Sequence, residues 1–290
     1  AFTIGGMGAE FNLNHPLFPT PQNYYSNLGI VQFGPSLAYK ITDNLSVGFS
    51  AHLVYSMMDF RMPYSLSPGA LQGQIPGMGG MTFGEMFAAP PTQGGFGYSE
   101  VTAYAAMKDL KGLGFNAKLG LAWMPSEQWT FGVVYNLPTP LNLRRGTAEM
   151  DMNAQFGDAM QRAVQGAMQQ GMSQAEAQAY VVGMFTQMGI DTGAGVAASY
   201  ELGADLEMPQ SIGLGLSFRP GPRLRLAVDF EWLNWKRSFD RMTLTLADGQ
   251  SANINLLMGN DGGFGIDFPM EWKDSCVLKF GVEHDLSASW

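Results

Sequence analysis

The chain has 290 residues, of which 14% are charged, 12% are aromatic and 37 are glycine. Ordinary soluble domains carry about 25% charged residues, and a helical membrane protein would show apolar runs of about 20 residues, which this sequence lacks. The net charge of -9 argues against a nucleic-acid partner, because phosphate contacts require clustered Lys and Arg.

The first alternating pattern lies in residues 31–40 and 45–55, where apolar residues alternate with small or polar ones. A period of two places the apolar side chains on one face of a strand, so the pattern predicts two strands joined by a tight turn at 41–44. Pro35 interrupts the first strand and predicts a bulge there, because proline cannot donate a ladder hydrogen bond.

The next segment, residues 59–111, is predicted to be a long loop. Its middle, residues 62–97, is dense in Gly, Pro and Met, which is typical of irregular structure. Within it, Phe83, Met86 and Phe87 are expected to line one wall of an apolar binding site.

Residues 113–137 show the clearest pattern in the chain. Apolar residues occupy alternate positions in 113–123 and, after a turn at 125–128, again in 129–137. The other face carries mainly Gly, Ala, Asn and Thr, and the apolar face ends in aromatic residues. This combination predicts a lipid-facing band with aromatic girdles around a polar barrel interior.

Residues 144–206 are predicted to be a second long loop, in which residues 154–188 have a helical period. Apolar residues recur at four-residue spacing up to Gly171, and Ser173 with Glu176 then forms a capping box for a second helix. A helical hairpin on a barrel has little core beneath it. Its apolar stripe must therefore cover the barrel mouth, another loop or an apolar ligand.

Two further strands, 211–219 and 224–232, are joined by a turn at 220–222, and a last strand covers 276–283 after a long segment at 248–271. Short turns thus alternate with long connections. Outer-membrane barrels have short periplasmic turns and long extracellular loops, so the long segments are expected to be extracellular. The predicted fold is all-β, an antiparallel transmembrane β-barrel of about eight strands with a helical hairpin in a long extracellular loop.

Four segments in register resemble the FadL-type outer-membrane transporters of long-chain fatty acids and hydrocarbons. Residues 112–135 resemble the central hairpin of that family. Residues 206–211 (Leu-Glu-Met-Pro-Gln-Ser) are similar to a strand entry. Residues 229–235 (Asp-Phe-Glu-Trp-Leu-Asn-Trp) resemble the next strand, and residues 268–274 (Phe-Pro-Met-Glu-Trp-Lys-Asp) resemble the loop that follows.

The resemblance implies a fourteen-stranded barrel whose lumen is plugged by an N-terminal hatch. This sequence shows no hatch, and its match at Trp290 is to an internal turn, so residues 1–290 are expected to be a single barrel domain and a fragment of a larger barrel. About eight strands would close a barrel filled by side chains, with no room for a long-chain lipid. The first residue is Ala1 and no signal peptide is visible, which also indicates a processed form or a fragment.

In the family, a ligand lands among extracellular loops, moves to an apolar pocket and leaves sideways at a kinked strand. The matching strand is residues 1–12, in which Gly5, Gly6 and Gly8 would weaken the ladder and permit a lateral gate. The alternative is a glycine-rich barrel strand without an opening.

The helical hairpin supplies further candidates for an apolar site. Methionine adapts to irregular apolar shapes, which suits the binding of alkyl chains. The alternative is simple packing of helix against helix and helix against barrel. The expected ligand-binding residues of the hairpin are Met160, Met168, Phe185 and Met188.

The lumen is expected to carry charges that bind a ligand headgroup or each other. The inward cations are Lys118, Arg225 and Lys279. The carboxylates expected on the same interior are Asp229, Glu231 and Glu283. The alternative to headgroup binding is a lumenal charge network that only satisfies itself.

No catalytic arrangement is apparent. Ser50 and His52 lie on one strand face with side chains about 7 Å apart, and three scattered histidines do not form a zinc site. The single cysteine, Cys276, lies at an outward strand position and excludes an internal disulfide. The chain is therefore expected to be no enzyme and to hold no cofactor or metal.

The sequence thus predicts an outer-membrane protein that passes hydrophobic small molecules, either long-chain fatty acids or hydrocarbons, by diffusion. It would bind them through apolar loops and release them laterally into the membrane lipid. Two alternatives remain: a structural or adhesive outer-membrane protein that acts through its long loops, and a porin for polar solutes.

Overall fold

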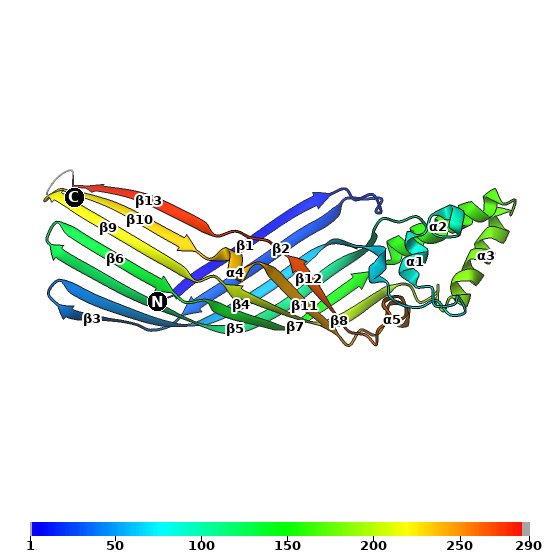
Figure 1. Ribbon diagram of the computed structural model, residues 1–290, viewed down its shortest axis with the longest axis horizontal. Helices are drawn as coiled ribbons and strands as arrows, with labels where there is room; N and C mark the ends of the chain where they lie inside the picture. Colours follow the sequence, from blue (N-terminus) through cyan, green and yellow to red (C-terminus); the bar gives the residue numbers. More distant parts are fainter. Residues whose placement is uncertain (1, 286–290) are drawn as a thin grey trace.

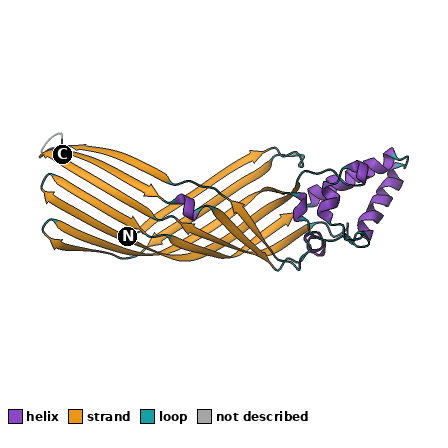
Figure 2. Cartoon of the chain, in the orientation of Figure 1, coloured by secondary structure: helices purple, strands orange, loops and turns teal. Residues whose placement is uncertain are grey.

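The computed structural model describes residues 2–285 as an elongated antiparallel β-structure with most of its helices gathered at one end (Figures 1 and 2). Within these residues, thirteen strands form one sheet. Tight turns close the hairpins at the end opposite the helices (Figure 1). The predictions made for Ala1 and Trp290 fall outside the described residues.

The elements alternate between long strands and helical connections. The strands are β1 (Phe2–Leu13), β2 (Gln22–Phe33), β3 (Ser36–Thr42), β4 (Leu45–Leu66), β5 (Val101–Ser126), β6 (Trp129–Asn136), β7 (Thr139–Asp151), β8 (Ala197–Met208), β9 (Ser211–Gly221), β10 (Leu224–Leu233), β11 (Arg241–Ala247), β12 (Phe264–Pro269) and β13 (Ser275–His284). The helices are α1 (Phe83–Ala88), α2 (Asn153–Gln169), α3 (Gln174–Gln187), α4 (Trp235–Ser238) and α5 (Ala252–Met258), with 3-10 turns at Pro68–Ala70 and Pro91–Gln93.

The two longest strands, β4 and β5, form the centre of the sheet. Along one edge of β4 lie β2 and β3, and along the outer edge of β5 lie β6 and β7. On the side of β6 the sheet continues through β9 and β10 to β13. On the side of β7 it continues through β8 and β11 to β12. Within residues 2–285, β1, β3, β12 and β13 each pair along one edge only.

The predicted number of about eight strands is wrong, because several expected strands are interrupted halfway. Breaks at residues 34–35, 137–138, 209–210, 234–240 and 270–274 separate strands that follow one another in the chain. Prolines at positions 35, 138 and 209 have no N–H for the ladder, which accounts for three of these breaks. The breaks form a line across the sheet, since strands end on both sides of it at paired residues (Asn136↔Ser211, Thr139↔Met208).

This break line separates two halves with opposite polarity. In the half that ends in the tight turns, large apolar side chains are exposed on the outer face, among them Leu119, Leu121 and Leu214. The inner face there carries small and polar residues such as Gly120 and Gly215, which line a cavity of about 540 Å³. We call this the turn half and the other the helix half.

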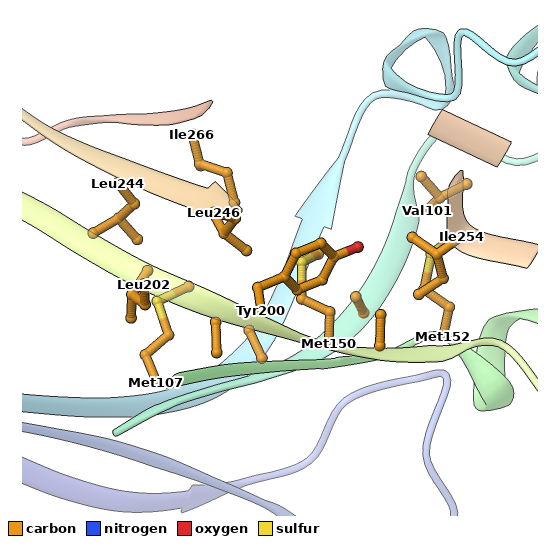
Figure 3. Close-up of a cluster of buried hydrophobic side chains, with 14 of the residues drawn as sticks. Val101, Met107, Met150, Met152, Tyr200, Leu202, Leu244, Leu246, Ile254 and Ile266 are labelled. Carbon is orange, nitrogen blue, oxygen red and sulfur yellow. The ribbon is translucent and has the colours of Figure 1, made fainter. Parts of the chain in front are cut away.

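In the helix half most apolar residues face inwards, although the exposed Phe2, Ile4 and Leu113 continue the apolar exterior a short way past the break line. Side chains from β5, β7, β8, β11, β12 and α5 converge on one buried cluster (Figure 3), in which Leu244 and Leu246 are almost fully buried. The outer face instead carries ion pairs, including Lys108–Glu149 at 3.1 Å and Arg144–Asp205 at 2.7 Å. Burial raises the pKa of the Tyr200 phenol, which lies in this cluster, to about 12.

The strands of the helix half reach further than the sequence predicts. The connections are residues 67–100 rather than 59–111, 152–196 rather than 144–206, and 248–263 rather than 248–271. Register shifts near Asp109 (φ 60°) and Arg145 (φ 61°) explain the first two differences. A bulge changes which alternate residues face inwards, so the period of two is lost at that point.

The predicted helical hairpin is present as α2 and α3. Gly171 between them has a φ of 99°, in the left-handed region that favours glycine. Ser173 caps α3 through the expected capping box with Glu176, and the hydrogen bonds from Ser173 lower the pKa of the Glu176 carboxyl. Within residues 2–285, no helix has both the length and the apolar character needed to span a membrane.

Replacement of the cap, Ser173→Ala, should loosen the first turn of α3. A serine cap is typically worth about 1 kcal/mol, so amide hydrogen exchange in that turn should accelerate about fivefold. Gln178→Ala on the exposed face of the same helix is the matched control and should leave exchange unchanged. Equal exchange in the two variants would show that the cap does not hold the helix.

Candidate ligand-binding site

An apolar cavity of about 430 Å³, here called chamber A, opens on the inner side of the helix half. Its volume is in the range of small-molecule binding pockets, about 300–1,000 Å³. Five methionines contribute to its wall from three strands and one strand break. They are Met7, Met58, Met62, Met242 and Met270.

Aromatic rings complete chamber A. Phe11 and Tyr25 come from β1 and β2, and Phe60 comes from β4 beyond its bulge. Phe268 from β12 makes an edge contact with Phe60, with ring centroids 6.0 Å apart. Flat rings and flexible thioethers together form a wall that fits apolar ligands of varied shape.

A second cavity of about 350 Å³, chamber B, adjoins the first next to the break line. Gly5, Gly6, Met208 and Trp235 line it, and within residues 2–285 no charged side chain does. Met7, Leu28 and Trp272 line both chambers. The two cavities are therefore neighbours along the inner face of β1 and β2.

One cation lies at the wall of chamber A. The guanidinium of Arg61 is 4.7 Å from the centre of the Tyr25 ring, and within residues 2–285 it forms no salt bridge. The neighbouring Asp59 carboxylate accepts the Asp109 N–H at 2.7 Å. Arg61 is thus available to a ligand carboxylate, a contact that charge-assisted hydrogen bonds favour.

The predicted residues of the two long loops are brought together at the helical end. Phe83, Phe87 and Phe185 are fully buried, and Phe156 contacts the rings of Phe87 and Phe185 at 5.5 and 6.0 Å. Met86 and Met188 are also buried, and Met160 packs against the cluster. Met168, however, is exposed, at 43%.

These loop residues fill space with one another, and neither chamber A nor chamber B includes them. Polar contacts fix the same region, because the Tyr98 hydroxyl donates to Asp158 at 2.6 Å and Arg162 stacks on the Tyr98 ring at 4.3 Å. Burial, and then the bond to Asp158, raise the pKa of the Tyr98 phenol. Packing accounts for these positions, and their role in ligand binding stays a prediction.

The three predicted lumenal cations lie in the turn half. Lys279 lines the 540 Å³ cavity with Asp229 and Glu231, and its Nζ is 3.8 Å from the Glu231 carboxylate. Arg225 pairs with Glu283 at 2.9 Å. Lys118 lines a separate pocket of about 350 Å³ and makes no salt bridge within residues 2–285. For Arg225 and Lys279, the geometry supports ion pairing within the lumen.

The glycine-rich strand β1 runs beside chamber B. It pairs with β2 without a register shift from Phe2↔Phe33 to Leu13↔Gln22, so this ladder has no kink. Gly5 and Gly6 line chamber B, whereas Gly8 does not. A Cβ on Gly6 would lie 2.8 Å from the Leu28 carbonyl oxygen, so this close strand approach requires glycine. The lateral gate stays a prediction.

No metal site emerges from the described part of the chain, where no group of three or more His, Cys, Asp or Glu side chains is placed to hold an ion. Cys276 is exposed on β13, at the outward position that the sequence predicts.

A sheet with an apolar outer band and a polar inner face is typical of the outer-membrane β-barrel class. The family model "Outer membrane protein transport protein (OMPP1/FadL/TodX)" matches residues 4–290. The chain therefore belongs to the OMPP1/FadL/TodX family of outer-membrane transport proteins, and it is no enzyme.

Three solved structures illustrate the shared fold. The toluene transporter TbuX of Ralstonia pickettii matches with a TM-score of 0.60 and 16% identity, over 99% of this chain and 61% of its own. The toluene transporter TodX of Pseudomonas putida gives 0.60 and 16%, over 99% and 60%. A FadL homologue of Pseudomonas aeruginosa gives 0.58 and 18%, over 99% and 54%.

The chain thus spans between 54% and 61% of the length of these three structures. At such low identity the likeness is one of fold. A comparison with curated proteins finds no match.

Proposed function

We propose that the protein passes hydrophobic small molecules through the outer membrane by diffusion, with chambers A and B as successive binding sites. The observation that carries the proposal is the pair of adjoining apolar cavities in the helix half, of about 430 and 350 Å³. Burial of a ligand there gains about 25 cal/mol per Å² of apolar surface removed from water.

The polarity of the two halves sets the membrane position in this proposal. The turn half lies in the bilayer, because its outer face is apolar and its strands β9, β10 and β13 have 11, 10 and 10 residues, close to the roughly 9–11 that cross a membrane. The apolar exterior continues past the break line onto the start of β1, where Phe2 and Ile4 are exposed, so the membrane boundary lies at the level of chamber B. Further from the tight turns the helix half projects into water, where its outer ion pairs are solvated. Long connections and helices then lie on the extracellular side.

The ligand path follows from this position. An apolar molecule enters chamber A at the extracellular end, moves to chamber B and leaves beside β1 into the membrane lipid. The lumen of the turn half is an unfavourable exit, because Asp229, Glu231 and Lys279 make it polar. Lateral release next to Gly5 and Gly6 avoids that barrier.

The substrate class is long-chain fatty acids or hydrocarbons. Methionines and aromatic rings suit either, and Arg61 offers a partner for a carboxylate. The similar proteins TbuX and TodX are toluene transporters, which favours an aromatic hydrocarbon. Neither class needs a cofactor, because diffusion down a gradient needs no energy source.

The test is uptake into liposomes that carry the intact protein, with a long-chain fatty acid, toluene and a sugar offered in parallel. Protein-dependent entry of either apolar solute, with the sugar excluded, is the expected result and identifies the class. Entry of the sugar would make the protein a porin. A folded protein that admits none of the three would leave only a structural or adhesive role.

A further inference from the structure

Three aromatic side chains lie where chambers A and B meet. Phe239 lines chamber A only, Trp235 lines chamber B only, and Trp272 lines both. Each ring contacts the other two: the centroids are 4.9 Å apart for Phe239–Trp272, 5.1 Å for Trp235–Trp272 and 5.4 Å for Trp235–Phe239. We call these three residues the aromatic partition.

The partition is carried by two breaks of the sheet rather than by strands. Trp235 and Phe239 belong to the break at 234–240, and Trp272 belongs to the break at 270–274. The two breaks are joined through Asp274, whose carboxylate accepts the Lys236 N–H at 3.0 Å and the Asn234 amide at 3.1 Å. The Trp272 N–H also donates to the Phe239 carbonyl at 3.3 Å. These hydrogen bonds fix the backbone of the two breaks, and the three rings border the chambers.

Trp272 differs from its two partners in facing a cavity on each side. Phe239 is buried, at 5% exposure, whereas Trp235 and Trp272 are partly buried. Rotation of the Trp272 side chain toward either chamber meets empty volume, so the main cost is loss of its two ring contacts. An aromatic contact is individually weak, which makes such a movement accessible at room temperature.

We infer that the aromatic partition divides the ligand path and that a ligand passes from chamber A to chamber B only when the Trp272 side chain moves aside. This inference rests on the proposed function, since it assumes that ligands occupy both chambers. It assigns Trp272 a specificity-determining role. A ligand in chamber A touches the Phe239 and Trp272 rings, and a ligand in chamber B touches Trp235 and the other side of Trp272.

A first experiment places the ligand next to the ring. In a variant that keeps Trp272 and replaces the other five tryptophans by phenylalanine, a brominated fatty acid should quench the emission in a saturable manner. The matched control keeps only Trp129, which lies on the outer side near the tight turns. Its emission should show only non-saturable quenching, in proportion to the amount of probe dissolved in the lipid. Uptake of the same probe without saturable quenching of Trp272 would overturn the inference and leave the proposed function standing.

A second experiment measures passage. Trp272→Ala removes both ring contacts of Trp272, so the uptake rate at saturating ligand should rise about tenfold, whereas Trp272→Phe should stay near the wild type. A merely structural role would slow uptake in the alanine variant instead, and either that result or an unchanged rate would overturn the inference. If the wild type takes up no apolar solute at all, the proposed function itself fails, and the partition fails with it.

Discussion

Met208→Glu should abolish uptake of apolar solutes almost completely. Met208 lines chamber B, which has no charged side chain in its wall. A carboxylate there is hydrated while the chamber is empty and must be desolvated when a ligand enters. That cost is several kcal/mol for an ion, so affinity and uptake should fall by roughly a hundredfold or more. Liposome uptake of toluene or a fatty acid measures it.

Two controls separate this effect from misfolding. Thr245→Glu places the same charge on the outer face of β11, where Thr245 is exposed, and should leave uptake unchanged. Acid should also rescue the chamber variant: a ligand raises the pKa of the introduced carboxyl, so uptake of toluene should recover as the pH falls and the carboxyl is neutralised. Equal uptake by both glutamate variants would remove chamber B from the path.

The turn half is the part of the fold that sequence reasoning predicts well. There the alternation in residues 113–123 and 129–137 meets no bulge between the aromatic ends, and outward residues such as Leu119 and Val133 are exposed as expected. The short turns and the outward position of Cys276 follow from the same pattern. A period of two is a local property, so it can be read directly from the sequence.

The helix half escapes that reading for a physical reason. A bulge shifts the inward residues by one position, so Phe60 and Arg61, just beyond the shift in β4, fall in a segment predicted to be a loop. In the helix half, most apolar residues point inwards and charged residues point outwards. This is the reverse of the pattern expected for a lipid-facing strand. Both chambers are lined by residues that follow these bulges and breaks, where the alternation is lost. The sequence therefore predicts the loop methionines as the binding site instead.

The partition residues illustrate the same limit. Trp235 and Trp272 stand in segments 229–235 and 268–274, which the sequence ties to the family but not to a site. They meet because the two breaks lie at one level of the sheet, and that level is set by strand register. The sequence signal for these residues is the presence of a tryptophan in each of two consecutive breaks between strands, close to a proline or a strand end.

Leu119→Arg tests the membrane position that the proposal requires. Leu119 lies on the outer face of β5, the strand that pairs with both β4 and β6, and it is 49% exposed. If the turn half spans the bilayer, this face meets hydrocarbon. An arginine near the midplane of a β-barrel costs about 2–4 kcal/mol, so the free energy of unfolding from phospholipid vesicles should fall by that amount in a urea titration.

Thr245→Arg is the matched substitution on the outer face of the helix half, where ion pairs such as Arg241–Asp267 already tolerate charge. It should change the free energy of unfolding by less than about 0.5 kcal/mol, as surface substitutions in water do. The difference between the two variants, rather than either value alone, reports which half is in lipid. Equal costs would mean that the break line does not mark the membrane boundary, and a larger cost at Thr245 would place the helix half in the bilayer. Either result would remove the membrane position on which the proposed ligand path depends.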